Sequence, residues 1–203
     1  VGDPMQLPPI VKSLNKPQYK MFNALAQVEG MTSFALGTDT KAYRIITSHR
    51  LTPASALLTG LFYDNRLSSV NRKRPNFSNI HSEYILPSGG VLYKDTNDMR
   101  NQLCSETALR IIEEILSDFK QYYPKAEIAI IAPFRDTVRE LQKNFQTTDA
   151  LHNLTIETVD RIQGMTVDYT IMYLPAWKHS FALDVRRFNV STSRSRTTTL
   201  ILS

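Results

Sequence analysis

Arginine side chains are the residues of this sequence best suited to chemistry, and they gather in two places. Arg50 follows Ser-His, and residues 186–196 contain four arginines. A guanidinium is always charged and can grip two oxygens of one phosphate, so it suits the stabilisation of a transferring phosphoryl group. Arg187 and Arg194 lie close to two helical turns apart, so we expect both to project from one face of a short helix and its end. The plainer alternatives are a surface ion pair at Arg50, worth under about 1 kcal/mol, and a solvated basic helix end.

The first nine residues, Val-Gly-Asp-Pro-Met-Gln-Leu-Pro-Pro, form a second polar stretch. Its prolines exclude a helix, and Gly-Asp-Pro taken alone predicts only a turn. Asp3 and Gln6 are its functional side chains. The Gln6 amide both donates and accepts hydrogen bonds, so it can contact a polar ligand of either kind.

Residues 158–168, Thr-Val-Asp-Arg-Ile-Gln-Gly-Met-Thr-Val-Asp, combine short polar groups with a glycine. Thr158 and Gln163 offer hydrogen bonds, and Gly164 permits a backbone to approach closely, as binding to a sugar-phosphate strand requires. For Asp168, a cap or ion pair at the start of the next strand is as well supported as a functional role.

Residues 131–135, Ile-Ala-Pro-Phe-Arg, come at the end of an isoleucine-rich run that predicts a buried strand. Pro133 ends this strand, and open α/β sheets bind ligands at the carboxyl ends of their strands. Phe134 is suited to stacking on a nucleobase, for roughly 1 to 3 kcal/mol, with Arg135 beside it for a phosphate. A place for Phe134 in the hydrophobic core is an equal alternative.

These stretches, in this order, resemble the signature motifs of the superfamily 1 helicases, in the branch that includes the RNA-decay and Okazaki-fragment helicases. Residues 1–9 resemble the third motif, residues 48–67 the fourth, residues 158–168 the fifth and residues 186–196 the sixth, while residues 131–135 resemble the family's Ile-Thr-Pro-Tyr stretch. The resemblance implies an ATP-dependent helicase that moves along single-stranded DNA or RNA and unwinds a duplex.

The resemblance also implies roles in nucleotide hydrolysis. Arg194 matches the arginine finger that reaches the γ-phosphate, Arg50 the arginine of the fourth motif, and Gln6 the γ-phosphate sensor. Three further residues are expected at the nucleotide: Asp3, Gly164 and Arg187. The sequence contains no Gly-x-x-x-x-Gly-Lys-Ser/Thr phosphate loop. We therefore expect ATP and Mg²⁺ to be held mainly by a missing N-terminal RecA-like domain, and this chain alone to be inactive.

For the nucleic-acid strand, the resemblance implies contacts with Thr158, Gln163, Pro133, Phe134 and Arg135. The sequence departs from the family pattern at Thr166, where a glutamate that contacts the ribose is usual, and at Thr137, where a glutamine is usual. These departures support an alternative, a RecA-like nucleic-acid or partner binding module without motor function. A third alternative is a nuclease-fused or toxin-associated ATPase, which only the flanking sequence would identify.

Composition narrows the class of protein. The chain has 203 residues, 42% of them hydrophobic, which is long enough to bury a full core. Its net charge of +5 favours a phosphate-backbone partner only weakly. Cys104 is the one cysteine and the four histidines lack ligand spacing, so neither a disulfide framework nor a zinc site is expected. No apolar run is long enough to span a membrane, and we expect a cytoplasmic protein, or a nuclear one if the source is eukaryotic.

The pattern of elements predicts how these residues are positioned. Strands are predicted at residues 42–47, 90–93, 127–132, 154–159, 169–174 and 198–202, and helices at residues 17–28, 53–61, 105–122, 135–145 and 184–193. Strands that alternate with helices predict a three-layer RecA-like α/β domain with a mainly parallel sheet. We expect residues 41–203 to form this second RecA-like domain and residues 1–40 to be the tail of the first.

Overall fold

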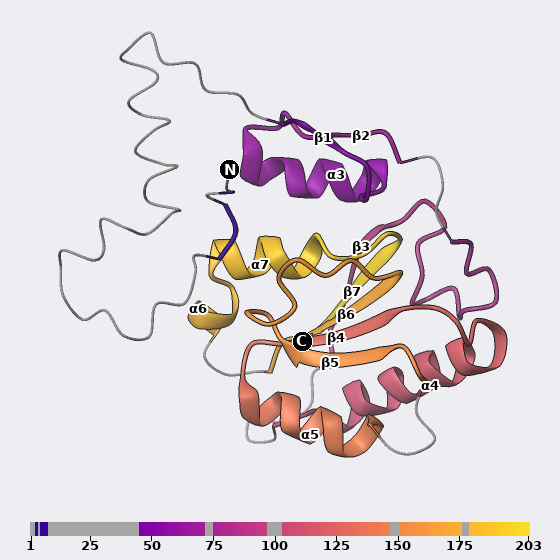
Figure 1. The fold of residues 1–203 in the computed structure, drawn as a ribbon. Helices are drawn as coiled ribbons and strands as arrows, with labels where there is room; N and C mark the ends of the chain where they lie inside the picture. Colours follow the sequence, from indigo (N-terminus) through magenta and orange to yellow (C-terminus); the bar gives the residue numbers. More distant parts are fainter. Residues whose placement is uncertain are drawn as a thin grey trace, which may run out of the picture.

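The computed structural model describes residues 3, 5–7, 45–71, 75–96, 103–146, 151–175 and 179–203. Its main feature is a five-stranded parallel sheet with helices on both faces (Figure 1), so the predicted three-layer α/β architecture is confirmed. The helix expected at residues 17–28 and the domain boundary expected near residue 40 lie outside the described residues. No helix in the described part of the chain is both long and apolar enough to cross a membrane.

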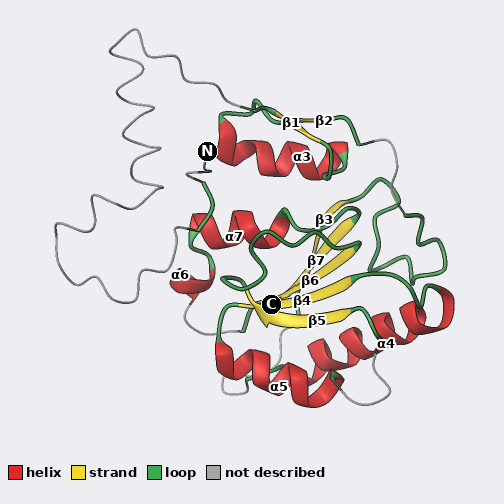
Figure 2. Ribbon diagram, in the orientation of Figure 1, coloured by secondary structure: helices red, strands yellow, loops and turns green. Residues whose placement is uncertain are grey.

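The sheet has the strand order β3-β7-β6-β4-β5, and its neighbouring strands run parallel (Figure 2). The strands are β3 (Gly90–Lys94), β4 (Ile128–Ala132), β5 (Leu154–Thr158), β6 (Tyr169–Tyr173) and β7 (Thr198–Leu202). In β4, Ile130 pairs with Ile156 on one side and with Ile171 on the other. Every residue of β4 is buried. Burial on both faces explains why its sequence is a continuous apolar run.

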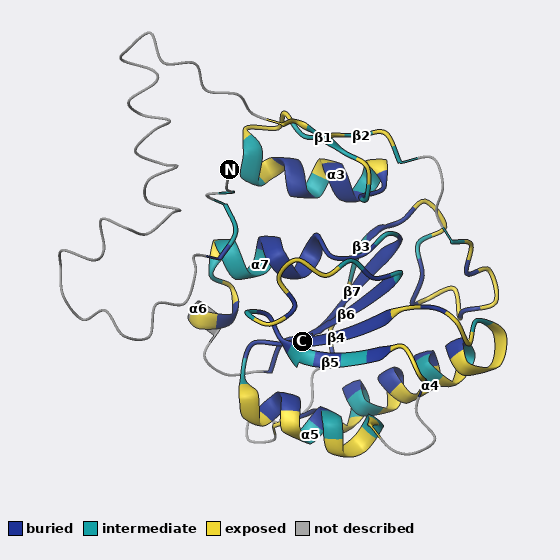
Figure 3. Ribbon diagram, in the orientation of Figure 1, coloured by how far each residue is buried: buried dark blue, intermediate teal, exposed yellow. Residues whose placement is uncertain are grey.

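Helices cover both faces of the sheet. α4 (Glu106–Tyr122) and α5 (Arg135–Phe145) lie on one face, and α7 (Val185–Thr192) lies on the other (Figure 1). Successive residues of β4 point to opposite faces. Ile130 therefore belongs to one hydrophobic cluster with Phe119 of α4, whereas Ile131 belongs to another with Val190 of α7. Figure 3 shows the strands buried between these helices; the outer sides of α4 and α5 are exposed, whereas most of α7 is buried or intermediate.

A small unit above α7 in Figure 1 carries the segment around Arg50. β1 (Thr47–Ser48) pairs in parallel with β2 (Ser68–Ser69), and α3 (Pro53–Gly60) and η1 (Leu61–Tyr63) connect them. The hydroxyl of Thr52 accepts a hydrogen bond from the backbone N–H of Ser55 at 3.1 Å, which caps α3 as predicted. Of the strand predicted at residues 42–47, residues 42–44 lie outside the described residues. Within the described part the strand begins only at Thr47, and β1 pairs outside the main sheet.

The amino-terminal motif packs onto the sheet domain. Leu7 is buried in the same hydrophobic cluster as Ile131 and Val190. The Leu7 carbonyl accepts a hydrogen bond from Gln163 Nε2 at 3.2 Å, and the Met5 carbonyl accepts one from an α7 side chain. Residues 5–7 therefore share a core with the domain that follows them in sequence.

Candidate functional site

A pocket of about 190 Å³ lies where the amino-terminal motif, the small unit and the end of α7 meet. Residues that line it include Asp3, Gln6, Arg50, Thr59, Tyr63 and Ser193. These residues come from the stretches that resemble the third, fourth and sixth motifs. Tertiary folding thus brings together polar groups from opposite ends of the sequence.

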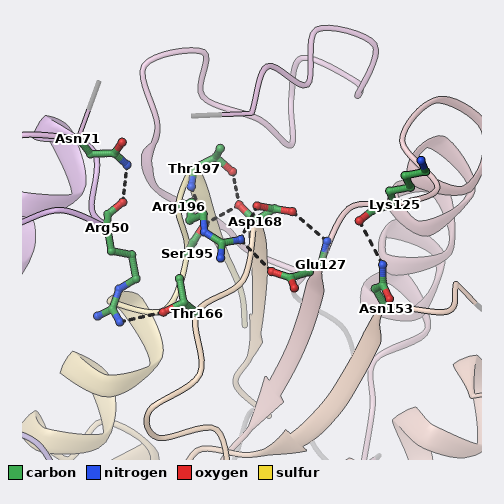
Figure 4. Close-up of polar contacts among 10 residues, drawn as sticks. All are labelled: Arg50, Asn71, Lys125, Glu127, Asn153, Thr166, Asp168, Ser195, Arg196 and Thr197. Carbon is green, nitrogen blue, oxygen red and sulfur yellow. Dashed lines mark hydrogen bonds and ion pairs between the residues drawn. The ribbon is translucent and has the colours of Figure 1, made fainter. Parts of the chain in front are cut away.

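Arg50 lies in the turn between β1 and α3. The Ser48 hydroxyl accepts hydrogen bonds from the backbone N–H groups of Arg50 and Leu51, at 3.3 and 3.1 Å. At the other end of the side chain, Arg50 Nη1 donates to Thr166 Oγ1 at 3.2 Å (Figure 4). Burial lowers the pKa of the guanidinium. Arg50 Nε is buried and has no hydrogen-bond partner among the described residues, so part of its bonding capacity is unused.

Arg194 lies just beyond the end of α7 and is 1% exposed. Its side chain turns back toward the helix, where Nε donates to the Val190 carbonyl and Nη2 to the Ser193 hydroxyl, both at 2.9 Å. Nη1 makes only a long contact of 3.5 Å with the Met165 carbonyl. These bonds go to neutral acceptors, so they hold the guanidinium in one orientation without neutralising it.

The buried position of Arg194 corrects one expectation from the sequence. Arg187 and Arg194 do not project together from one helical face, because α7 ends at Thr192 and Arg194 points inward. Burial, and then the nearby Arg50, lowers the pKa of Arg194 to about 10. At neutral pH the side chain is therefore still a cation, held near a second cation.

Asp3 organises the polar side of the pocket. Its Oδ1 accepts a hydrogen bond from the backbone N–H of Met5 at 3.0 Å. Its Oδ2 accepts two, from Gln6 Nε2 and from the Tyr63 hydroxyl, both at 2.7 Å. The Tyr63 oxygen in turn accepts from Asn189 Nδ2 at 2.9 Å. Burial and the hydrogen bond to Asp3 raise the pKa of Tyr63 to about 12, so the phenol is neutral and acts as a donor.

The charges around the pocket are unbalanced. Among the described residues, neither Arg50 nor Arg194 belongs to an ion pair. A desolvated cation without a counterion is costly, and an oxyanion beside it removes that cost. The arrangement is therefore suited to a phosphate group. No cluster of three or more His, Cys, Asp or Glu side chains in the described part of the chain is placed to hold a metal ion.

The residues expected at a sugar-phosphate strand lie in the turn after β5. Thr158 is largely buried, and its carbonyl accepts hydrogen bonds from the backbone N–H groups of Arg161 and Ile162. Gly164 is exposed and has a φ of +90°, a backbone conformation that favours glycine, although a Cβ would meet nothing within 4 Å. The Gln163 amide is already engaged, because it donates to the Leu7 carbonyl.

Phe134 lies at the carboxyl end of β4, just after the buried Pro133 and before the exposed Arg135. Its ring stacks on Phe181 of α6 (His179–Ala182), with centroids 5.4 Å apart and planes 23° apart. The Arg187 guanidinium also lies over the Phe181 ring, 3.9 Å from its centroid. Phe134 is thus half-buried. This burial lies between the two alternatives from the sequence, a place in the hydrophobic core and an exposed ring that stacks on a nucleobase.

Arg187 lies away from the residues that line the pocket. It approaches Asp160 and Asp184 at 3.9 and 3.8 Å, in addition to its contact with Phe181. The pocket lining includes neither Arg187 nor Gly164. The structure therefore does not bring these two predicted nucleotide contacts to the same place as Gln6.

Asp168 forms an ion pair at the start of a strand, which is the structural one of the two roles considered from the sequence (Figure 4). Its carboxylate accepts hydrogen bonds from Arg196 Nη1 at 2.8 Å and from the backbone N–H of Glu127 at 3.0 Å. Arg196 also pairs with the Glu127 carboxylate at 2.8 Å. These residues precede the parallel strands β7, β6 and β4, so the cluster fastens the starts of three strands.

Two residues of the site, Tyr63 and Phe181, were given no role from the sequence, and Asn189 was matched only to the asparagine of the sixth motif. Tyr63 and Asn189 lie within or beside recognisable motifs, but nothing in their spacing predicts that they touch. Phe181 follows a stretch without clear periodicity, and its pairing with Phe134 depends on where α6 packs. The roles of these residues depend on tertiary contacts, which a single sequence does not reveal.

Comparisons with known proteins agree with these observations. Helicase sen1 of Schizosaccharomyces pombe is 24% identical over 220 aligned residues that cover 100% of this chain and 13% of that protein. A probable helicase of Dictyostelium discoideum is 26% identical over 222 aligned residues, covering 100% of this chain and 21% of that protein. The chain thus spans about an eighth to a fifth of the length of these relatives.

Solved structures show a more distant likeness. The arterivirus nonstructural protein 10 helicase is 14% identical, with a TM-score of 0.39 over 77% of this chain and 24% of that one. The PRRSV helicase is 15% identical, with a TM-score of 0.40 over 79% of this chain and 23% of that one. Because these TM-scores are low, the assignment depends on sequence. The AAA domain family matches residues 21–203, nearly the whole sequence, and the chain belongs to that family.

Proposed function

We propose that this chain is the C-terminal part of an ATP-dependent helicase, which couples ATP hydrolysis to movement along single-stranded DNA or RNA and to unwinding of a duplex. The observation that carries the proposal is the pocket, which Gln6 and Arg50 line, with the buried Arg194 directly after the lining residue Ser193. Among the described residues, neither arginine belongs to an ion pair. The two helicase relatives support the same conclusion. Residues 41–203 are assigned to the second RecA-like domain, and residues 1–40 to the end of the first.

The residues of the pocket fit a phosphate group better than a metal ion. Arg50 Nε is unpartnered among the described residues, whereas the Asp3 carboxylate already accepts three hydrogen bonds. When bound, ATP supplies the phosphoryl group and Mg²⁺ neutralises part of its charge. We assign the main grip on both to an N-terminal RecA-like domain outside this chain. Arg50 and Arg194 would stabilise negative charge that develops on the γ-phosphate.

The nucleic-acid strand is assigned to the carboxyl ends of β4 and β5. Phe134 and Arg135 begin α5 there, and Thr158 ends β5. A half-exposed aromatic ring and an exposed arginine suit a strand that is bound by stacking and phosphate contacts, without reading its sequence. Fluorescence anisotropy with labelled oligo-dT and oligo-U should show affinity that falls with salt, with a slope near −0.7 per phosphate contact. Affinity that hardly changes with salt would contradict this assignment.

The motor assignment is tested by phosphate release. The purified chain of residues 1–203 should hydrolyse no ATP, even with single-stranded nucleic acid present, because an arginine finger alone has no bound substrate to act on. The full-length protein should turn over ATP faster when the nucleic acid is added. Turnover by residues 1–203 that survives repurification would overturn the assignment. A full-length protein that binds nucleic acid without hydrolysing ATP would establish the binding-module alternative instead.

A further inference from the structure

We propose that Tyr63 is a positioning residue for ATP hydrolysis, which sets the orientation of Gln6 through Asp3 and ties it to α7 through Asn189. This inference rests on the function proposed above. It is carried by four hydrogen bonds that join three segments far apart in sequence: Gln6 to Asp3, Tyr63 to Asp3, and Asn189 both to Tyr63 and to the Met5 carbonyl.

The chemistry of the partners determines every donor and acceptor in this network. An ionised carboxylate only accepts hydrogen bonds, so Tyr63 must donate to Asp3, and Gln6 must turn its Nε2 toward Asp3. A backbone carbonyl also only accepts, so Asn189 must turn its Nδ2 toward Met5. The rotation of the Gln6 amide about its last bond is therefore not free.

The bond to Asp3 uses one of the two N–H groups of the Gln6 amide and turns Oε1 away from the carboxylate. Gln6 lines the pocket, and its Oε1 has no hydrogen-bond partner among the described residues. An amide oxygen accepts hydrogen bonds, so it can orient a water molecule or a donor on the opposite arginine, but it cannot donate to a phosphate oxygen. Losing the Tyr63 hydroxyl would leave Asp3 with one donor fewer and allow the Gln6 amide to turn.

The same network connects the sensor to the helix that precedes Arg194. Asn189 is 0% exposed and lies in α7, one position before Val190, whose carbonyl holds Arg194 Nε. A movement of Asp3 and Gln6 would therefore be transmitted through Tyr63 and Asn189 to α7, which positions the Arg194 guanidinium. Tyr63 is the only side chain among the described residues that bonds to both Asp3 and Asn189.

The test is steady-state ATP hydrolysis by the full-length protein with saturating single-stranded nucleic acid. Tyr63→Phe should lower kcat about tenfold, the typical effect of losing one hydrogen bond, with little change in KM for ATP. Gln6→Ala should lower kcat at least as much. Since Tyr63 acts through Gln6, adding Tyr63→Phe to Gln6→Ala should cause no further loss. Asp3→Asn replaces a carboxylate oxygen by an amide N–H group, which cannot accept from Gln6 and Tyr63. It should lower kcat as Tyr63→Phe does, and it should likewise cause no further loss when added to Gln6→Ala.

Tyr93→Phe is the matched control, because Tyr93 is 65% exposed on the edge strand β3. It should leave kcat unchanged. Normal kcat in Tyr63→Phe beside a strongly impaired Gln6→Ala would overturn this inference and leave the proposed function standing. Additive losses in the double variant would also overturn it, because they would show that Tyr63 acts independently of Gln6. Normal kcat in Gln6→Ala would instead contradict the proposed role of the pocket.

Discussion

Arg194 and Arg196 are two positions apart in the sequence, yet they lie in opposite electrostatic surroundings. Arg194 is buried beside the pocket, its bonds go to neutral oxygens, and burial lowers its pKa to about 10. Arg196 is half-exposed just before β7, where the hydrogen bonds that it donates to Glu127 and Asp168 raise its pKa. Among the described residues, Arg194 has no ion pair, whereas Arg196 is paired with two carboxylates.

This difference separates a binding region from a structural one. A cation paired with two carboxylates gains nothing from a phosphate, since binding would require breaking existing ion pairs. A buried cation without an ion pair lowers the stability of the fold, an incoming anion removes that cost, and such groups cluster at functional sites. We therefore interpret the pocket around Arg50 and Arg194 as functional, and the cluster around Asp168 as a fastening of the strand starts.

The comparison is tested most strongly by removing each arginine in turn. In the full-length protein, Arg194→Ala should lower kcat for ATP hydrolysis by roughly 10³-fold, as loss of an arginine finger does. Arg194→Lys should restore little activity, because an ammonium does not reproduce the planar fork. Arg196→Ala should leave kcat within about twofold of wild type. Equal losses in Arg194→Ala and Arg196→Ala, measured by phosphate release from folded protein, would remove the distinction.

The structural side of the comparison predicts a stability effect without a catalytic one. Asp168→Ala removes one of the two carboxylates that accept from Arg196 and the acceptor for the backbone N–H of Glu127, and should lower the free energy of unfolding by about 1 to 3 kcal/mol. Urea denaturation would measure it, with the exposed pair variant Asp136→Ala as a control that should change little. A loss of kcat in Asp168→Ala that exceeds the loss of folded protein would place Asp168 in the functional region.

A third prediction concerns the aromatic surface at the end of β4. Phe134→Ala should weaken binding to single strands about tenfold at every salt concentration, because stacking does not involve counterion release. Arg135→Ala should instead reduce the salt slope by about one phosphate contact. Leu183→Ala, at a 47% exposed apolar position just after α6, is the control and should bind normally. A Phe134→Ala variant that only melts earlier, with unchanged binding in anisotropy, would show that Phe134 is a core residue.

The smallest expected effect is on alkaline stability. The folded protein holds the Tyr63 proton to a pKa of about 12, against an ordinary value of 10.0. Its contribution to stability is therefore complete below pH 10 and is lost as pH rises toward 12. Across this window, the unfolding free energy of Tyr63→Phe should fall less steeply with pH than that of wild type. The difference in slope should correspond to less than one bound proton. Urea titrations at several pH values would measure the slopes, and Tyr93→Phe should follow the wild-type slope.

Local elements were predictable where local physics determines them. The helix predicted at residues 135–145 coincides with α5, and the predicted Thr52 cap and first-turn Pro53 are present in α3. The continuous apolar run of β4 predicted a strand buried on both faces. The strand β2 was not predicted, and the predicted strand at residues 42–47 overlaps β1 only at Thr47. Such short pairings have no periodicity of their own and exist only where another segment lies alongside.

The sequence by itself determined the alternating order of elements, the positive charges and the motifs that carry family membership. Only the tertiary structure decided which of those charges are paired. Arg187 lies over the Phe181 ring, and its expected contact with the nucleotide stays a prediction. Tyr63 bonds to Asp3 and Asn189 bonds to Tyr63, which joins three segments far apart in the sequence. The physical reason is that periodicity and capping act over a few residues, while the environment of a buried charge depends on segments that meet only after the sheet and its helices have packed.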